Sequence, residues 1–284
     1  MLATYYIPSP PLDAYVDHLY YLDHLLPYAR EKILPDAGLD LKINLGGVIR
    51  AYKPGQPEPF MIGSDSWGVG LWSAYHIIDW PQDIQFFGVN FKPGGAYPFL
   101  RIPLSELHDG VVSLDAIWGY VAAEIRERLC AVPTLAERFA LLERLLLARL
   151  SETLAQDRHD FRAVHYALAQ MGLRHGALSI KELSDKIGIS QNHLTNQFKR
   201  LVGGTPKEIA RLYRFQHILQ NIDPLHPVEW TEVAHQALYY DQSHFNKDFM
   251  AFTGHTPGDY LRLRQQVYAE SPQHAWYFRA LPTD

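Results

Sequence analysis

The spacing of apolar residues in the N-terminal part of the chain is that of β-strands. Between Leu39 and Leu45 apolar and polar residues alternate strictly, which predicts a strand with one buried face. Aromatic and β-branched residues are frequent in four further short segments. Strands are therefore expected at 48–52, 60–63, 67–78 and 84–91. Several short strands at this spacing indicate an antiparallel barrel or sandwich.

Helical spacing appears on both sides of these strands. Leu12, Tyr15, Val16 and Leu19 are spaced for a short amphipathic helix. After residue 114 apolar residues recur every four positions from 117 to 129, and Thr134 with Glu137 opens a second helix as a capping box. A wide apolar band follows on that helix, up to residue 150. Such a band either packs inside the monomer or meets a partner, so both alternatives stay open.

A helix-turn-helix pattern begins at Ser179. Ser179 and Glu182 form a capping box, Gly188 supplies a tight turn, and Ser190 caps a second helix. One side of the second helix is apolar. Its outer side consists of Gln191, Asn192, Thr195, Asn196 and Lys199. A helix, a glycine turn and a helix with a polar, basic outer face are typical of a DNA-binding helix-turn-helix, although an ordinary helical hairpin shares the pattern.

The same pattern returns about fifty residues later, from Trp230. Its residues follow the first copy at an offset of 50 before the turn and 51 after it, as for His193 and His244. An internal repeat with one inserted residue indicates two copies of one unit. The outer side of the second copy consists of Gln242, Ser243, Asn246 and Lys247. A long helix from Thr205 to about Asn221 is expected to bridge the copies.

These residues carry a family resemblance. Residues 243–262, SHFNKDFMAFTGHTPGDYLR, resemble the signature end of the AraC-type transcription regulators, and the span from Phe161 to Arg264 resembles their double helix-turn-helix domain. Two positions depart from the family pattern: Leu238 replaces the usual turn glycine, and Asn196 stands where many members have arginine. More loosely, 33–47 and 86–100 resemble a cupin-like N-terminal sensor domain of one branch of the family.

The expected fold is α+β and multidomain. A cupin-like antiparallel β-barrel or sandwich with flanking helices is assigned to 1–114, a helical pair with a linker to 115–157, an all-α double helix-turn-helix to 158–268, and a tail to 269–284. Residues 1–157 hold 12 basic against 19 acidic residues, a net charge of −7. Residues 158–268 hold 13 against 10, a net charge of +3. An acidic half joined to a mildly basic half fits a sensor joined to a DNA binder.

The resemblance implies a DNA-binding transcription regulator with a small-molecule effector. The expected partners are double-stranded DNA, a second copy of the chain, and RNA polymerase if the protein is an activator. The predicted DNA contacts are the nine polar residues on the outer sides of the two repeated helices. Arg211 and Arg214 on the bridging helix contact either phosphate or internal partners, with an internal role favoured for Arg214.

Enzymatic chemistry is not expected from this sequence. The N-terminal histidines, His18, His24, His76 and His108, are scattered and lack the clustered spacing of a metal cupin, so no metal or cofactor is assigned. The alternatives are a cupin-type enzyme with a DNA-targeting domain and a ligand-independent dimeric regulator. The single cysteine, Cys130, excludes an intrachain disulfide and is expected to be buried.

The sequence shows no recognisable targeting signal. No apolar run reaches the length of a membrane span and no signal peptide is recognised at the N-terminus, so a cytoplasmic location is expected.

A largely apolar ligand pocket is predicted where aromatic residues crowd the strands, with a solid core as the alternative. Its predicted lining is Trp67, Trp72, Tyr75 and Trp80, with Phe86, Phe87 and Phe91 on the next strand.

Overall fold

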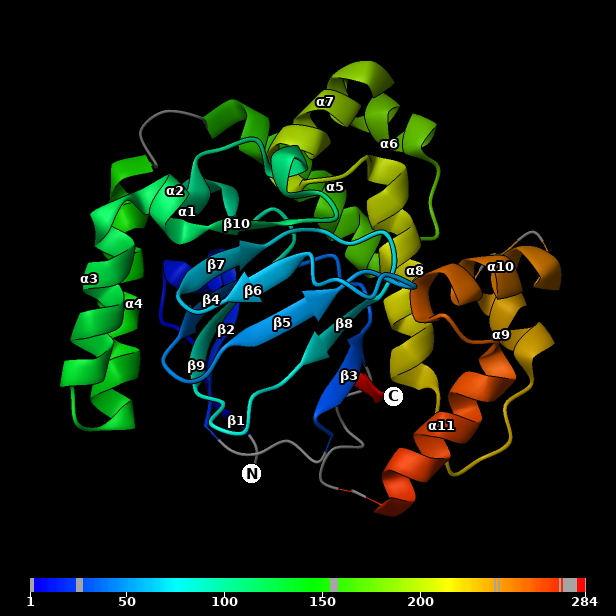
Figure 1. Ribbon diagram of the computed structural model, residues 1–284. Helices are drawn as coiled ribbons and strands as arrows, with labels where there is room; N and C mark the ends of the chain where they lie inside the picture. The colour runs from blue at the N-terminus through cyan, green and yellow to red at the C-terminus, as the bar shows by residue number, and fades with distance from the viewer. Residues whose placement is uncertain are drawn as a thin grey trace.

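A computed structural model describes residues 3–23, 28–153, 158–237, 239, 241–270, 272 and 280–283. In it, a β-rich N-terminal part lies beside a helical C-terminal part (Figure 1). Leu238, His24, residues 154–157 of the expected linker and the aromatic residues of the tail lie outside the described residues.

The N-terminal part is a sandwich of two antiparallel sheets. One sheet has the strand order β1-β2-β9-β4-β7-β10 and the other has the order β11-β3-β8-β5-β6. The strands of the first sheet are β1 (Ala3–Tyr6), β2 (Val16–Leu22), β4 (Leu39–Asn44), β7 (Ser66–Val69), β9 (Phe86–Phe91) and β10 (Val111–Ser113). Those of the second are β3 (Arg30–Ile33), β5 (Ile49–Tyr52), β6 (Met61–Gly63), β8 (His76–Asp79) and β11 (Ala280–Pro282).

Two predicted elements are wrong. The helix expected around Leu12–Leu19 is a single 3-10 turn, η1 (Leu12–Ala14), followed by β2. Pairing of β2 with β1 on one side and β9 on the other outweighs the helical spacing of its apolar residues. The single strand expected at 67–78 is split into β7 and β8. Between them the Gly70 backbone packs so closely on the Leu107 carbonyl that a Cβ atom at Gly70 would lie 1.8 Å from its oxygen.

The helical pair covers the outer face of the first sheet (Figure 1). It consists of α3 (Tyr120–Ala131), which follows α2 (Leu114–Trp118) after Gly119, and α4 (Leu135–Thr153). The ring of Phe139 on α4 stacks on Tyr6 at 5.3 Å and lies edge-on to Phe87. Most of the apolar band on α4 is therefore part of the monomer core, while three leucines remain partly exposed: Leu135, Leu145 and Leu147. Cys130 is exposed, so the expectation that it is buried is wrong.

Seven helices form most of the described C-terminal part. They are α5 (Arg158–Leu173), α6 (Ile180–Ile187), α7 (Gln191–Val202), α8 (Pro206–Asn221), α9 (Trp230–Gln236), α10 (Gln242–Thr253) and α11 (Pro257–Glu270). The caps predicted for α6, α7 and α8 are present. The Ser190 side chain accepts from the first turn of α7, and Thr205 with Glu208 forms a complete capping box on α8. Gly188 takes the left-handed conformation of the turn, with φ of 80°.

The two parts share one core rather than touching at a linker. Leu34, Ala37 and Leu71 of the N-terminal part belong to the same buried cluster as the cores of α7 and α8. Lys32 on β3 donates a hydrogen bond from Nζ to Nε2 of His255, at 2.8 Å. The described end of the tail, β11, pairs with β3 and so extends the second sheet. Short elements complete this region: α1 (Tyr97–Leu100) and η2 (Leu104–Leu107), the latter beside α7.

Candidate DNA interface and ligand cavity

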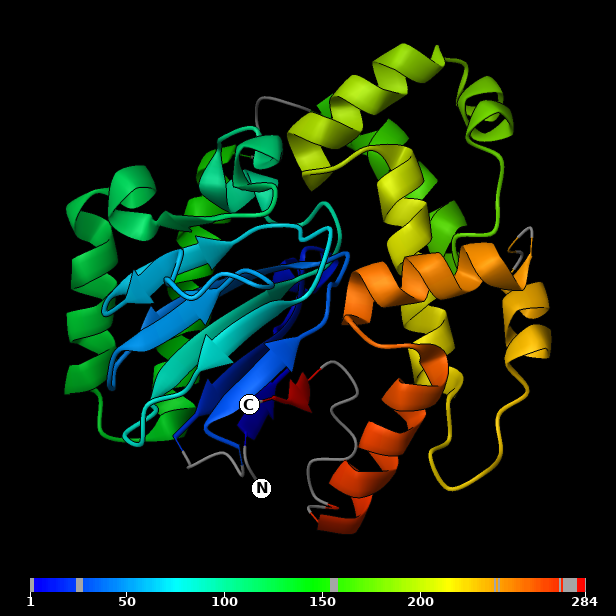
Figure 2. The ribbon, with the colours of Figure 1, turned by 45° about the vertical axis from the view of Figure 1, so that its right-hand side comes forward.

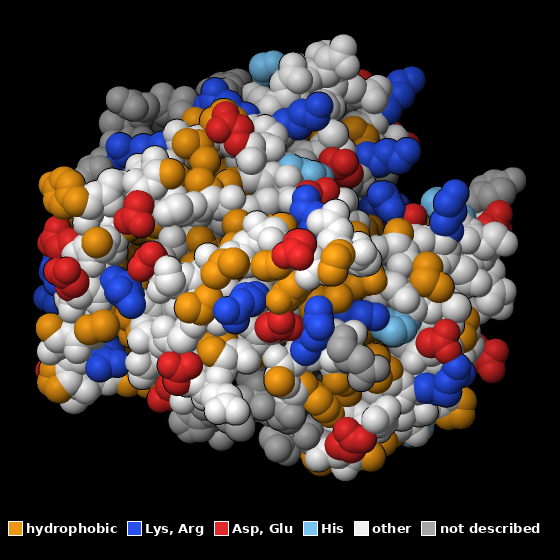
Figure 3. Space-filling model, in the orientation of Figure 1, with side chains coloured by type: hydrophobic (Ala, Val, Ile, Leu, Met, Phe, Trp, Pro, Cys, Tyr) orange, Lys and Arg blue, Asp and Glu red, His pale blue; other side chains and the backbone are white. Residues whose placement is uncertain are grey.

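The outer faces of α7 and α10 hold the nine polar residues predicted from the sequence. All of them are exposed except Thr195, which is half-buried. The opposite faces are buried, with Leu194 and Phe198 on α7 and Phe245 and Phe249 on α10. Lys and Arg side chains also gather over the region of α6 and α7 on the face seen in Figure 3. Both helices therefore present polar, partly basic surfaces supported by an apolar core.

The bridging helix α8 runs between the two helix-turn-helix units (Figure 2). Its Arg211 donates two hydrogen bonds to the Asp248 carboxylate on α10, from Nε at 3.1 Å and from an Nη at 2.8 Å. Arg214 donates to the Gly176 carbonyl at 3.2 Å. Both arginines therefore have internal partners, as expected for Arg214, and Arg211 fixes α10 onto α8 through a bidentate pair.

Two histidines of the repeated helices also contact neighbours on their own helix. His193 Nε2 is 3.0 Å from the side-chain nitrogen of the buried Gln197. His244 lies 4.0 Å from the Asp248 carboxylate. Among the described residues, no group of three or more His, Cys, Asp or Glu side chains is placed to hold a metal ion.

A cavity of about 520 Å³ lies between the two sheets. Trp67, Trp72 and Trp80 line it, as do Phe86 and Phe91. Tyr75 does not belong to its lining, contrary to the prediction. The Tyr75 ring packs instead against Gly254, at the turn after α10, with the Lys32 Nζ 5.0 Å from its centroid. The Phe87 side chain is also absent from the lining, because strand alternation turns it toward α4.

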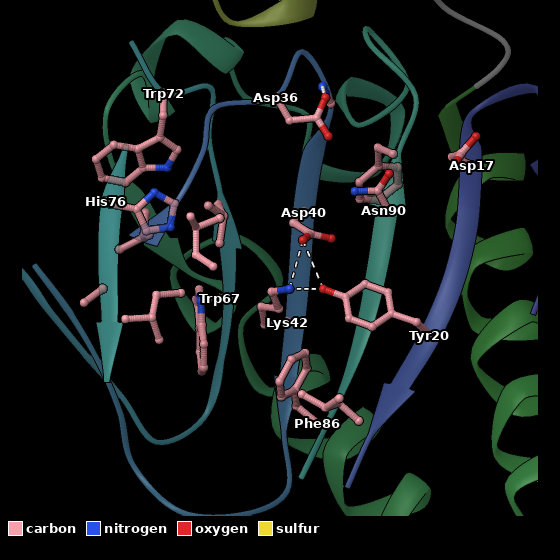
Figure 4. A pocket seen from close by; sticks show the side chains of 18 of the residues that line it. Asp17, Tyr20, Asp36, Asp40, Lys42, Trp67, Trp72, His76, Phe86 and Asn90 are labelled. Atoms are coloured by element: carbon pink, nitrogen blue, oxygen red, sulfur yellow. Dashed lines mark hydrogen bonds and ion pairs between the residues drawn. The ribbon is translucent and has the colours of Figure 1, made fainter. Parts of the chain in front are cut away.

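A buried polar cluster occupies the cavity wall, which the prediction of a largely apolar pocket missed. Asp40 and Lys42 from β4 and Tyr20 from β2 point toward one another (Figure 4). Lys42 Nζ donates to Asp40 Oδ2 at 2.9 Å and also to the Tyr20 hydroxyl, which itself donates to Asp40 at 3.0 Å. Burial raises the pKa of Asp40 and lowers the pKa of Lys42, because both charged forms lose hydration.

Glu31 on β3 is a second carboxylate in the wall. It is 7% exposed, and its Oε2 accepts a hydrogen bond from the Trp80 indole at 2.8 Å. Burial raises the pKa of Glu31 to about 7, and the Trp80 hydrogen bond lowers it only in part. Arg30 and Lys32, the neighbours of Glu31 in the strand, do not line the cavity. Glu31 is therefore a buried carboxylate without an ion-pair partner among the described residues.

An aromatic group forms another part of the wall. The Trp72 ring packs on His76 at 4.6 Å and on Phe60 at 5.1 Å. Burial, aided by the Lys42 charge, lowers the pKa of His76 to about 3, so its ring is neutral at physiological pH. The Trp72 indole nitrogen and His76 Nδ1 are buried and have no hydrogen-bond partner among the described residues. Within the described part of the chain, both polar atoms therefore lack the hydrogen bond that buried polar groups usually have.

The cavity is closed partly by the helical half of the chain. Tyr213, Gln216 and Gln220 of α8 contribute to its lining. Gln216 also donates a hydrogen bond to Asp36, another lining residue. The helix that bridges the two helix-turn-helix units thus lies directly against the cavity.

Sequence reasoning found the aromatic lining but not its polar groups. Asp40 and Lys42 occupy the polar positions of the alternating strand, which the pattern assigns to solvent. The signal that could have identified them is the aromatic content of the neighbouring strands, since a polar strand face opposite such residues can face a cavity. Glu31 and His76 carry no comparable signal, because an isolated Glu or His is common on any surface.

Two family models match parts of the chain. Residues 4–113 match a domain of unknown function, DUF6597, and residues 183–263 match a helix-turn-helix domain. No curated protein matches the chain. No helix in the described part of the chain is both long and apolar enough to cross a membrane.

Several solved structures are similar to this chain. ToxT from Vibrio cholerae O395 is 9% identical, with 86% of this chain and 95% of that chain covered and a TM-score of 0.44. ToxT from strain SCE256 with a bound unsaturated fatty acid is 11% identical, with 86% and 93% covered and a TM-score of 0.40. The AraC-like transcriptional activator CuxR is 15% identical, with 76% and 86% covered and a TM-score of 0.26.

Proposed function

We propose that this chain, an AraC-type DNA-binding transcription regulator, reads double-stranded DNA with the outer faces of α7 and α10. The observation that carries the assignment of these faces is the distribution of buried apolar and exposed polar side chains on the two helices. Leu194, Phe198, Phe245 and Phe249 are buried, and Gln, Asn, Ser and Lys side chains are exposed at the matching positions of both copies. This arrangement leaves hydrogen-bonding groups free for base edges in a major groove.

Binding would begin with phosphate contacts and end with base contacts. Lysines attract the backbone, and asparagine or glutamine can pair bidentately with adenine. The Arg211–Asp248 pair holds α10 on α8, which supports a fixed spacing between the two helices. Two helices held on one side of the duplex would enter successive grooves about 34 Å apart.

The test starts from DNA selected by the full chain out of a random pool. Affinity for the selected site is then measured at several salt concentrations for the native protein and for Gln191→Ala and Lys247→Ala. A lost base contact should cost about 1–3 kcal/mol, and a lost phosphate contact should lower the salt slope by about one. Matched controls are Gln56→Ala and Arg128→Ala, which remove exposed side chains of the N-terminal part. Unchanged affinity and slope in both α7 and α10 variants would contradict the assignment.

We also propose that the cavity between the sheets is the effector site. Its volume of about 520 Å³ lies within the usual range of ligand pockets, and its wall combines aromatic rings with a few polar groups. A molecule in the cavity would contact Gln216 and Gln220 of α8, and α8 holds α10 through Arg211. Effector binding would thereby change the placement of α10. Measuring DNA affinity with and without a bound compound tests this link, with Gln220→Ala expected to weaken it.

The proposed partners further include a second copy of the chain. For an activator, RNA polymerase is a further proposed partner. The proposed location of the protein is the cytoplasm. The partly exposed Leu145 and Leu147 support dimerisation through α4. Sedimentation of the full chain and of a Leu145→Lys variant tests it. A native chain that stays monomeric at high concentration would assign these leucines to the monomer surface alone.

A further inference from the structure

The cavity wall is richer in acidic than in basic side chains, which constrains the charge of its ligand. Four carboxylates line it, from Asp17, Glu31, Asp36 and Asp40, against two lysines, Lys42 and Lys92. An inference about ligand charge rests on the proposal that this cavity is the effector site. The charge of the ligand depends on whether the lysines or the carboxylates of the wall are available to bind it.

The lysines already have partners. The Lys42 ammonium group is held by Asp40 at 2.9 Å and by the Tyr20 hydroxyl. Lys92 is exposed, and its Nζ donates to the Asp13 carbonyl at 2.6 Å. An anionic ligand would have to displace Asp40 from Lys42 and would then lie among like charges. Like charges at short range in a buried site repel strongly.

Of the four carboxylates, Glu31 is the most available. Asp17 lies 2.8 Å from His18, Asp36 accepts a hydrogen bond from Gln216, and Asp40 holds Lys42. Glu31 has the Trp80 indole as a partner but no cation among the described residues. Its strand neighbours cannot supply one: Arg30 pairs with Asp79 at 3.2 Å, and Lys32 bonds to His255. A buried carboxylate without a cation is stabilised when a bound molecule supplies one.

Aromatic rings stand beside these carboxylates. Trp80, which donates to Glu31, is stacked on Phe86 with ring centroids 6.1 Å apart and an angle of 8°. Phe86 is also the ring nearest the Lys42 ammonium after Tyr20, at 4.9 Å. Aromatic faces attract cations, and Trp does so most strongly. The rings around Glu31 therefore favour the same ligand charge as the carboxylate does.

We infer that the cavity binds a protonated amine with an apolar body, its ammonium group on Glu31 and its body against the rings of Trp80 and Phe86. The ammonium group would donate to the Glu31 carboxylate. A carboxylic acid of the same size is the disfavoured ligand.

The test uses three probes that share one body: 4-phenylbutylamine, 4-phenylbutanol and 4-phenylbutyrate. Their binding to the full chain is measured by titration calorimetry and by the fluorescence of the tryptophans that line the cavity. The amine is expected to bind at least about tenfold more tightly than the alcohol, because a charge-assisted hydrogen bond is stronger than a neutral one. The butyrate is expected to bind more weakly than the alcohol.

Two variants assign the effect to named residues. Glu31→Gln keeps the acceptor for Trp80 and should weaken amine binding about tenfold while leaving alcohol binding within twofold. Lys42→Gln removes the competing cation and should tighten amine binding. Melting temperatures establish that each variant is folded, and Glu58→Gln, on an exposed loop, is the control.

The outcomes separate this inference from the effector proposal. Tighter binding of the butyrate than of the amine, lost in Lys42→Gln, would overturn the inference and leave the effector site in place. Equal binding of the amine and the alcohol would also overturn it. Absence of binding by all three probes at millimolar concentration would overturn the effector site itself.

Discussion

Replacing Glu31 by glutamine should stabilise the protein at neutral and alkaline pH. The change removes a charge from a residue that is 7% exposed, and the glutamine oxygen can still accept the Trp80 hydrogen bond. Burial raises the pKa of Glu31 from 4.5 to about 7. The folded protein therefore holds this proton more tightly than the unfolded chain does, and ionisation of Glu31 costs folding free energy.

The magnitude follows from the distance between the two pKa values. The stabilising contribution of the protonated Glu31 is fully present below about pH 4.5 and is lost as pH rises toward 7. One pKa unit corresponds to about 1.4 kcal/mol, so the total loss is about 3 kcal/mol. Above pH 7 both states are ionised and the loss no longer grows. The glutamine variant lacks this loss. The difference in free energy of unfolding between the variant and the native protein should therefore be about 3 kcal/mol larger at pH 8 than at pH 4.5.

Denaturant unfolding of both proteins between pH 4.5 and 8 measures this difference. Every other titrating group is common to both proteins, so the difference between their free energies of unfolding isolates Glu31. The Glu58→Gln variant, which removes an exposed carboxylate, is the control. A difference between native protein and Glu31→Gln that stays constant across this range would refute the assignment of Glu31 as a buried, unneutralised carboxylate.

Two further substitutions test the packing within each half of the chain, one in the helical half and one in the N-terminal half. Arg211→Ala leaves the nearly buried Asp248 without its bidentate partner and should lower the free energy of unfolding by about 3 kcal/mol, as well as weakening binding to the selected DNA site. Denaturation and DNA titration measure it, and a loss no larger than that of Arg262→Ala, in an exposed pair, would contradict it. Phe139→Ala should cost about 3–5 kcal/mol, since the ring is 3% exposed and packs between α4 and the first sheet. A cost below about 1 kcal/mol in the same assay would show that α4 is not part of the monomer core.

Local sequence signals were sufficient for most of the helical half. The Ser190 cap, the Thr205–Glu208 capping box and the Gly188 turn act within a few residues, so local sequence alone determines where α6 ends and where α7 and α8 begin. The internal repeat predicts a second unit of the same kind, and the structure has it. The nine polar residues also follow from local spacing, because a helix with one apolar side must expose the other.

The β-rich half shows where local signals fail. The spacing of residues 12–19 fits a helix, yet Val16–Leu22 forms a strand because two distant segments, β1 and β9, pair with it. The split of the predicted strand at 67–78 depends on the close approach of Gly70 to Leu107, nearly forty residues away in sequence. Neither contact is encoded in the spacing of the segment that it changes.

The alternation of Leu39–Asn44 determined that this strand has one apolar and one polar face, but the tertiary structure decided what each face meets. The apolar face, with Leu41 and Ile43, lies in the core under α3 and α4. The polar face, with Asp40 and Lys42, faces the cavity and not bulk water. Period two assigns side chains to two sides of a sheet, and it carries no information about which layer covers either side. The second sheet and α8, remote in sequence, turn a polar strand face into the wall of a ligand cavity.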